Sequence, residues 1–383
     1  MESMSKSKTH FLILVLAVLL LVGFLFIRFN RQTARSLLPS RLFFRNDRLN
    51  GSRIISPSPA MISTAPSAPV VTQNPSTSAS ANPFGVMLAQ NMSVSDRINL
   101  AKSLGVVYYR PTNVKVDSDD LTCEDCDEAN LIGLKLILTI RNGGGMGNPS
   151  TPPTDLNAYK NRVARVLDMY KPYLLVVENE ENSGALFYSG TPAEYHQELA
   201  AACSVAHSKG YKCTNGGLVS SEVALLVADS YKTGGNTQKA DDYLKRTLSS
   251  DKYNQYIRNP NASRIVEAIQ KGKDLLAGYK AAGADFVNFH WYVADTAALI
   301  EAVNYLRNTT GLQALTNEVG QQLNTDPNQV TSVMQEIVNL RLPVAVWFSM
   351  DIQGFAGARG LNETDGTIRP NGEAFKNFIT QNY

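Results

Sequence analysis

The chain has little cysteine, with four residues among 383, and this excludes a small fold held together mainly by disulfides. The pairs Cys123 with Cys126 and Cys203 with Cys213 can each close a local bridge in an oxidising compartment, or remain free thiols. The wider separation of the second pair is not a usual zinc-ribbon spacing. We therefore assign no metal to the cysteines.

The chain also lacks a strong excess of charge of either sign, because its formal net charge is +2 and 18% of its residues are charged. The arginines from Arg28 to Arg53 follow an N-terminal apolar stretch, which leaves the remainder slightly acidic. Nucleic-acid binding requires a basic face on the folded domain, so no nucleic-acid partner is expected. A hydrophobic content of 44% over this length favours one large folded domain.

The N-terminus contains an uncharged apolar run from Phe11 to Ile27, long enough to span a bilayer marginally. No small-residue cleavage site follows promptly, which favours a retained anchor over a removed signal peptide. The sequence therefore predicts a membrane anchor or signal segment over residues 1–28. The arginines after this segment outnumber the lysines before it, and the positive-inside rule alone would keep the C-terminal part in the cytoplasm.

Residues 29–82 are predicted to be a disordered linker, basic at first and then rich in Pro, Ser and Thr. The stretch from Ile55 to Asn82 has no charge and no apolar periodicity, so it cannot bury enough surface to fold. Such a segment is typical of a stalk, or of a simple interdomain linker. Despite the arginine flank, we expect the domain that follows to be extracytoplasmic, either membrane-anchored or secreted.

From Pro83 to Tyr383, short apolar runs alternate with helical segments, which is typical of βαβ units and a parallel sheet. Strands are expected over residues 84–88, 106–109, 134–140, 173–177, 211–214, 285–289, 312–316 and 343–348. Helices are expected over residues 94–104, 119–132, 155–170, 192–209, 263–282, 296–308, 327–340 and 372–380. Eight such units predict an α/β fold, a (β/α)8 TIM barrel. A doubly wound sheet would share the alternation, but no Gly-rich phosphate loop follows the first strand.

An insertion at about 216–261 interrupts this alternation after the fifth strand and includes a helical stretch from Gln238 to Leu248. Barrel active sites are assembled from the loops that follow the strands. We therefore expect the insertion to shape the rim of a substrate cleft, with packing decoration as the alternative.

Polar side chains occur at the C-terminal ends of four expected strands. They are Arg110 after the second strand, Asn179, Glu180 and Glu181 after the fourth, His290, Trp291 and Tyr292 after the sixth, and Asn317 and Glu318 after the seventh. Glycosidic bond cleavage requires one carboxyl group to protonate the leaving oxygen and a second to attack or to activate water. Strands four and seven face each other across the barrel mouth, so their glutamates can approach to the roughly 5 Å that a covalent glycosyl-enzyme route requires.

In these motifs the chain resembles the clan of retaining (β/α)8 glycosidases that carry both catalytic glutamates on strands four and seven, glycoside hydrolase clan A. The resemblance implies that Glu180, preceded by Asn179, is the acid/base and that Glu318 is the nucleophile. Many clan members have proline after the acid/base, where this chain has Glu181, so Glu181 competes with Glu180 for that role.

The resemblance also implies a set of substrate-binding residues near the two glutamates. These are Asn179, Arg110, His290, Tyr292 and Trp347, to which Trp291 adds a second apolar face for a sugar ring. Glu318 is expected to stay ionised beside Arg110 and Tyr292, and Glu180 to be held protonated until the leaving group departs.

Each candidate also has a plainer structural interpretation. The glutamates can be ion-paired rim residues, Arg110 a partner in a rim salt bridge, His290 a core histidine, and Trp347 part of the barrel wall. No histidine spacing suggests a metal, and we expect no metal and no cofactor.

The sequence therefore predicts a monomeric retaining glycosidase that acts on a carbohydrate polymer or oligosaccharide and meets the membrane through its N-terminal segment. Transglycosylation would share the covalent intermediate and differ only in the acceptor. One alternative is a non-catalytic carbohydrate-binding or adhesion barrel on a membrane stalk. Another is a cytoplasmic-facing barrel that acts on a small metabolite.

Overall fold

The computed structural model describes residues 81–88, 91–321, 326–350 and 360–383, and these residues contain a closed parallel barrel. The strands are β1 (Phe84–Leu88), β2 (Tyr108–Tyr109), β3 (Val114–Lys115), β4 (Lys135–Arg141), β5 (Leu174–Val177), β6 (Lys212–Asn215), β7 (Phe286–Trp291), β8 (Gln313–Val319) and β9 (Ala345–Ser349). Their order in the sheet is β2-β1-β9-β8-β7-β6-β5-β4-β3, and a further β2–β4 pairing closes the ring. Because β3 pairs only with the end of β4, the barrel strands number eight.

All eight expected strands are confirmed; the first has the expected boundaries, and the boundaries of the others differ by up to three residues. In chain order the barrel strands one to eight are β1, β2, β4, β5, β6, β7, β8 and β9. Side chains alternate along each strand, so those on one face pack in one core and those on the other face pack in a second core. Val176, Leu315 and Val346 belong to a small core inside the barrel, whereas Val177 and Trp347 belong to the large core shared with the helices.

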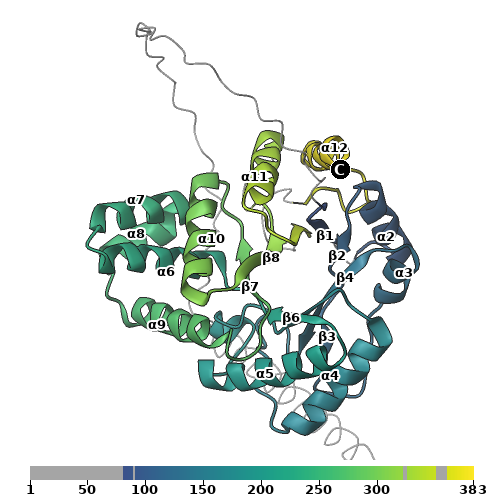
Figure 1. Ribbon diagram of the computed structural model, residues 1–383. Helices are drawn as coiled ribbons and strands as arrows, with labels where there is room; N and C mark the ends of the chain where they lie inside the picture. Colours follow the sequence, from purple (N-terminus) through teal and green to yellow (C-terminus); the bar gives the residue numbers. More distant parts are fainter. Residues whose placement is uncertain (1–80, 89–90, 322–325, 351–359) are drawn as a thin grey trace, which may run out of the picture. The chain divides into compact units, whose positions relative to one another are not determined.

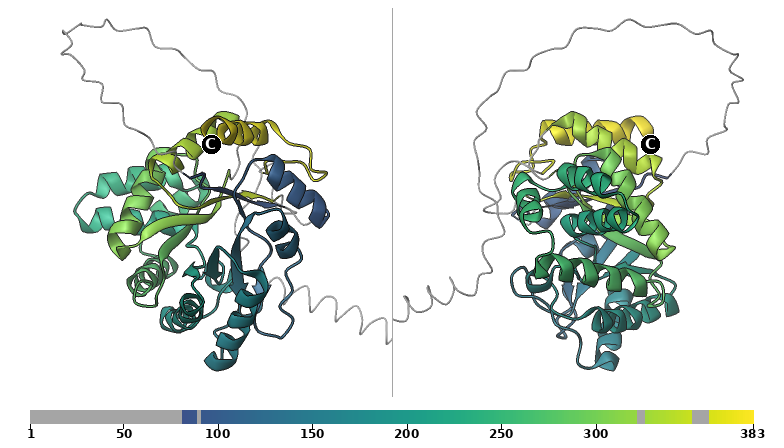
Figure 2. Two further views of the ribbon diagram at one scale, coloured as in Figure 1. Left: turned by 45° about the vertical axis from the view of Figure 1, so that its right-hand side comes forward. Right: turned by 90° about the vertical axis from the view of Figure 1, so that its left-hand side faces the viewer.

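The helices lie around the barrel (Figures 1 and 2). They are α2 (Val94–Ser103), α3 (Cys126–Leu131), α4 (Leu156–Tyr170), α5 (Pro192–Ser208), α9 (Ser263–Gly278), α10 (Thr296–Thr310), α11 (Pro327–Asn339) and α12 (Pro370–Asn382). Most begin where the sequence places a capping side chain. Thr191 and Glu194 form a capping box at α5, and Asp295 caps α10 by accepting from the backbone N–H of Ala298.

The helix expected over residues 119–132 is much shorter, because α3 spans only Cys126–Leu131. A Cys123–Cys126 disulfide joins the preceding segment to the first residue of α3, and the buried Asp125 carboxylate accepts hydrogen bonds from Arg97 and Tyr109. These tertiary links hold the segment before α3 outside a helix. The second cysteine pair, Cys203–Cys213, is also bridged and joins α5 to β6.

The insertion is largely helical rather than a loop with one helix. It contains α6 (Ser220–Thr233), α7 (Thr237–Thr247) and α8 (Ser250–Arg258), of which only α7 matches a predicted helix. The three helices group together on one side of the barrel, where α6 packs against α9 and α10 (Figure 1).

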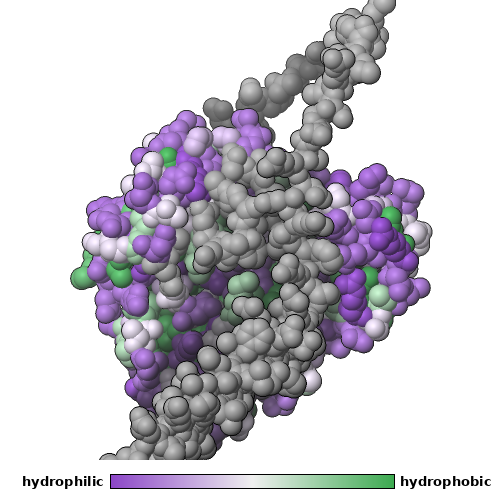
Figure 3. All heavy atoms as spheres, turned by 180° about the vertical axis from the view of Figure 1, so that it is seen from behind, coloured by the Kyte–Doolittle hydropathy of each residue, from purple (hydrophilic) through white to green (hydrophobic). Residues whose placement is uncertain are grey.

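The predicted anchor, residues 1–28, and the predicted linker, residues 29–82, lie outside the described residues except for Ala81 and Asn82. Among the residues that are described, no helix combines the length and the apolar character needed to cross a membrane. On the face turned away from the viewer in Figure 1, hydrophilic side chains predominate and apolar ones are scattered (Figure 3).

Candidate active site

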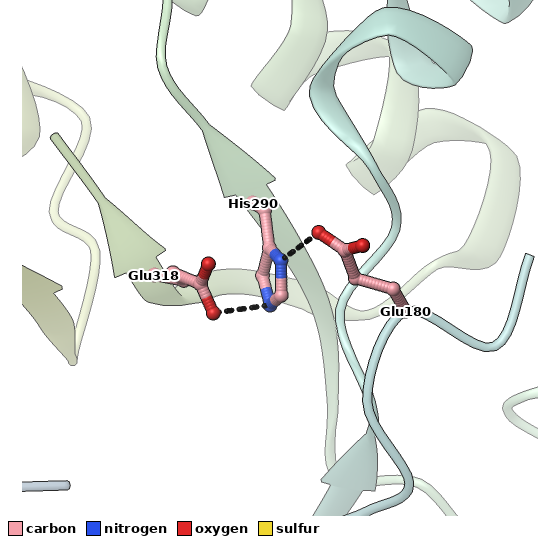
Figure 4. Close-up of side chains that lie close together, drawn as sticks. All are labelled: Glu180, His290 and Glu318. Atoms are coloured by element: carbon pink, nitrogen blue, oxygen red, sulfur yellow. Dashed lines mark hydrogen bonds and ion pairs between the residues drawn. The ribbon is translucent and has the colours of Figure 1, made fainter. Parts of the chain in front are cut away.

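Glu180, His290 and Glu318 come together at the carboxyl ends of the barrel strands (Figure 4). Glu180 follows β5, whereas His290 and Glu318 lie near the ends of β7 and β8. His290 Nδ1 lies 2.9 Å from Glu180 Oε1, and His290 Nε2 lies 3.6 Å from Glu318 Oε2. One side-chain oxygen or nitrogen from each of the three residues lies within 4.8 Å of the others. The structure therefore brings the two predicted glutamates to the two sides of one imidazole ring.

The backbone after β5 turns sharply at Glu178 and Glu180. Glu178 and Glu180 have φ angles of 66° and 47°, a left-handed conformation that is uncommon for residues other than glycine. The buried Glu178 carboxylate supports the turn by accepting hydrogen bonds from the backbone N–H of Asn142 at 2.6 Å and from the Ser150 hydroxyl at 2.5 Å. Strain of this kind persists only where surrounding contacts enforce it.

The two candidates for the acid/base role lie in different environments. The Glu180 side chain is 14% exposed and faces His290. Glu181 is buried, where it accepts hydrogen bonds from Asn215 at 2.8 Å and from the Tyr279 hydroxyl. Burial raises the pKa of Glu181, although those hydrogen bonds oppose the shift. Only Glu180 of the pair is therefore positioned to meet a substrate at the barrel mouth.

Glu318 is held by a cation and a hydroxyl group. Arg110 donates to Glu318 Oε2 at 2.6 Å, and the Tyr292 hydroxyl donates to Oε1. Arg110 also donates to Asn179 Oδ1 at 2.7 Å, so it links the predicted sugar-binding amide to the second carboxylate. Burial by itself raises the pKa of Glu318, but the charges of His290 and Arg110 and the hydrogen bonds outweigh it, and the net pKa is lowered.

A β-bulge in β8 aims two consecutive residues at the mouth. The register of β8 shifts by one residue against β7 between Leu315 and Glu318, and by one residue against β9 between Thr316 and Val319. This extra residue allows Asn317 and Glu318 to contact the same histidine, which strict alternation along a strand would forbid.

The ring of His290 is fully buried and lies between acceptors. Its Nε2 lies 3.1 Å from Asn317 Oδ1, and that oxygen is oriented by a hydrogen bond from Asn288 Nδ2 at 2.7 Å. Both ring nitrogens can donate only in the protonated form. Burial lowers the pKa of His290, but the carboxylates of Glu318 and Glu180 outweigh burial, so the net pKa is raised.

The start of the insertion forms part of the wall around this histidine. Gly217 has a φ of +103°, and a Cβ placed on it would lie 2.3 Å from His290 Nε2. Ser220 Oγ donates to the His290 carbonyl oxygen at 3.0 Å. The insertion therefore does more than decorate the barrel, because its first residues contact the candidate site.

The prediction that Trp291 and Trp347 offer apolar faces to a sugar is wrong. Their side chains are 0% and 1% exposed and point into the helix layer, where the ring centroids of Trp347 and Phe375 of α12 are 5.6 Å apart. The ring centroids of Trp291 and Phe289 are 6.1 Å apart. Strand alternation explains both positions, because Trp291 lies between the inward His290 and Tyr292, and Trp347 follows the inward Val346.

Three residues to which the sequence assigned no role also reach the site. The ring centroids of Phe348 and Tyr292 are 5.8 Å apart. The alternation of β9 would have identified Phe348, instead of Trp347, as the aromatic residue on the side of the site. Asn317 stood out in the sequence only as a polar residue at a strand end, and Asn288 did not stand out. Their part in the site is recognisable from the contact of Asn317 with His290 and from the hydrogen bond between the two amides.

The spacing of Glu180, His290 and Glu318 could also hold a metal ion. However, Arg110 already pairs with Glu318, and both ring nitrogens of His290 face oxygen acceptors. The donor set therefore favours a hydrogen-bonded cluster of carboxylates, imidazole and guanidinium over a divalent cation.

Comparisons with known proteins bear on the fold. No family model matches the sequence, and no curated protein matches it. Solved structures do resemble it. A glucosidase from Croceicoccus marinus is 12% identical with a TM-score of 0.53, and the match covers 79% of this chain and 68% of that one. An exo-β-1,4-mannosidase from Opitutaceae bacterium strain TAV5 is 14% identical with a TM-score of 0.50, covering 78% and 59%.

An oligosaccharide-binding protein from Trichoderma gamsii is 13% identical with a TM-score of 0.43, and the match covers 81% of this chain and 98% of that one. The structures with TM-scores of 0.50 and above confirm that the fold resembles that of barrel glycosidases.

Proposed function

We propose that this protein is a retaining glycoside hydrolase that cleaves O-glycosidic bonds of a carbohydrate polymer or oligosaccharide. The separation of Glu180 and Glu318 carries the proposal, because one carboxyl oxygen of Glu180 lies within 4.8 Å of one carboxyl oxygen of Glu318. Retaining enzymes place their two carboxyl groups about 5–5.5 Å apart, whereas inverting enzymes need about 6.5–9.5 Å to admit a water molecule.

In the first step, a Glu318 oxygen attacks the anomeric carbon while the glycosidic C–O bond breaks. The leaving oxygen takes a proton from Glu180. His290 Nδ1 lies 2.9 Å from Glu180, so the two groups can share the proton that this step requires. Arg110 and Tyr292 orient Glu318 and stabilise its ionised form.

In the second step, water attacks the anomeric carbon and gives its proton to Glu180, and the bond to Glu318 breaks. Two displacements at one carbon restore the original configuration. A sugar hydroxyl in place of water would give transglycosylation through the same intermediate.

The proposal includes an extracytoplasmic, monomeric catalytic domain, anchored to the membrane through residues 1–28 or secreted. The two disulfides support an oxidising compartment, because such bridges rarely persist in the cytosol. The fold shared with a glucosidase and a mannosidase supports a carbohydrate substrate.

The test is a screen of the full chain against aryl glycosides and polysaccharides, with the anomeric configuration of the first product followed by NMR. We expect retained configuration, with turnover lost in Glu180→Gln and Glu318→Gln but kept in Glu267→Gln, an exposed glutamate on α9. Azide should restore turnover of Glu180→Ala by attacking the glycosyl-enzyme without a general base. Binding without turnover, unaffected by either substitution, would instead favour a non-catalytic carbohydrate-binding barrel.

A further inference from the structure

The insertion brings a group of polar and charged side chains to the segment that follows Glu180. Asn182 Nδ2 donates to the Glu222 carboxylate, and the backbone N–H of Val219 donates to Asn182 Oδ1 at 3.2 Å. These bonds hold the first turn of α6 beside Glu180. Ser220 ties the same turn to β7 through the His290 carbonyl oxygen at 3.0 Å. The position of this turn is therefore set by the candidate site itself.

Two half-buried lysines, Lys252 and Lys271, lie close enough to Glu222 of this turn for their charges to act on it. Lys252 of α8 donates to Ser221 Oγ at 3.2 Å, and Lys271 comes from α9. Four lysines elsewhere in the described chain form ion pairs, as Lys273 does with Asp229 at 2.6 Å, whereas within those residues neither Lys252 nor Lys271 has a carboxylate at ion-pair distance. An ammonium group removed from water is costly unless an anion compensates it.

The pKa of each lysine shifts in the direction that this cost predicts. Burial lowers the pKa of Lys252 more than the carboxylates of Glu222 and Glu180 raise it. Burial likewise lowers the pKa of Lys271 against the opposing influence of Glu222 and Glu181. Both ammonium groups are therefore incompletely compensated by the protein.

Glu222 does not supply the missing charge at neutral pH. Burial, and then the charge of Glu180, raise the pKa of Glu222 to about 8, although Lys271, Lys252 and the Asn182 hydrogen bond oppose the shift. Near pH 7 its carboxyl group is therefore mainly neutral and acts as a hydrogen-bonding group. Two cations thus face a largely uncharged partner beside the candidate acid/base.

We propose that Lys252 and Lys271, together with Ser221, form a subsite on the leaving-group side of Glu180 for an anionic group of the saccharide, a carboxylate, sulfate or phosphate. The inference rests on the proposed function, since a leaving-group side exists only if Glu180 protonates the departing oxygen. Asn182 and Glu222 offer hydrogen bonds to hydroxyl groups of the same sugar residue. The substrate class that fits is an acidic glycan.

The test measures equilibrium binding of the full chain to matched neutral, uronic-acid, sulfated and phosphorylated oligosaccharides. Glu318→Gln is the parent, so that no glycan is cleaved during the measurement. We expect at least one anionic form to bind about tenfold or more tightly than its neutral counterpart, with a preference that weakens as salt rises. Comparison of the three anionic forms identifies the group that is bound.

In this parent, the double change Lys252→Met and Lys271→Met should abolish the preference. Lys252→Arg with Lys271→Arg should retain it, because the charge remains. Lys273→Met is the matched control on α9, since Lys273 is exposed and already paired with Asp229. Equal binding of neutral and anionic glycans, or a preference that survives the double methionine change, would overturn the proposal.

Failure of the subsite and failure of the proposed function give different results. Cleavage of neutral glycans by the unaltered protein, without any anionic preference, would retain the glycosidase and reject the subsite. A lysine-dependent preference in a protein that cleaves none of the glycans it binds would retain an anion-binding site and reject the hydrolase.

Discussion

Replacing Gly217 by alanine tests how closely the insertion packs against His290. The added Cβ would lie 2.3 Å from His290 Nε2, whereas an ordinary contact begins near 3.4 Å. The ring must therefore move by about 1 Å, and a displacement of that size at a reacting group can reduce the rate by about 100-fold. Alanine at a φ of +103° adds roughly 1–2 kcal/mol of backbone strain.

Gly235→Ala separates these two costs. Gly235 is exposed, has a φ of +80°, and has nothing within 4 Å of the added Cβ, so it reports backbone strain alone. Urea unfolding should give a loss of about 1–2 kcal/mol for Gly235→Ala and roughly 2–5 kcal/mol for Gly217→Ala, because only the latter adds overpacking. kcat/KM on any glycoside that the protein cleaves should fall only in Gly217→Ala.

A double-mutant cycle with His290→Ala completes the test. If the clash with the ring is the cause, Gly217→Ala should cost less stability once the ring is removed. Equal losses for Gly217→Ala and Gly235→Ala, with unchanged activity in both, would refute the reasoning.

Three further predictions concern other parts of the site. Because the pKa of Glu318 is lowered in the folded protein, the ionised carboxylate stabilises the fold fully above its ordinary pKa of ~4.3, and this contribution is lost as the pH falls through the folded-state pKa. In urea titrations, the difference in unfolding free energy between the protein and Glu318→Gln should therefore become smaller between pH 6 and pH 3. A difference that stays constant over this range would contradict the prediction. Arg110→Met should lower the free energy of unfolding by roughly 3 kcal/mol, because Glu318 loses its guanidinium partner. Arg110→Lys should still lose activity, because lysine cannot reach both Glu318 and Asn179. Full activity of the lysine variant in kinetic assays would argue against this link. Trp347→Phe should lower thermal stability and leave KM unchanged, and a raised KM would restore the sugar-platform interpretation.

The barrel could be predicted from the sequence because its signals are local. Runs such as Leu174–Val177, buried on both faces, appear as continuous apolar stretches, and capping residues such as Thr191 mark the helix starts. The two glutamates followed from the same pattern, because barrel topology places the carboxyl ends of all the strands at one mouth. The sequence by itself thus located the candidate site.

Strand alternation, which the sequence carries, is sufficient to place both tryptophans on the helix side of the barrel. His290 and Tyr292 both point into the mouth, so Trp291 between them faces the helices. The truncated helix before Cys126 had a different cause. The late start of α3 depends on Arg97 and Tyr109, which contact Asp125 only after the chain has folded.

Only the tertiary structure decided which partners surround the two glutamates. Asn317 reaches His290 through a bulge in β8, and Gly217, Glu222 and Lys252 approach from an insertion whose helical content was largely unrecognised. A bulge depends on the pairing of neighbouring strands, and the path of an insertion depends on the surfaces that it packs against. Local periodicity carries neither kind of information, so the sequence determined the position of the chemistry, whereas its protonation and the charge around it were decided by the fold.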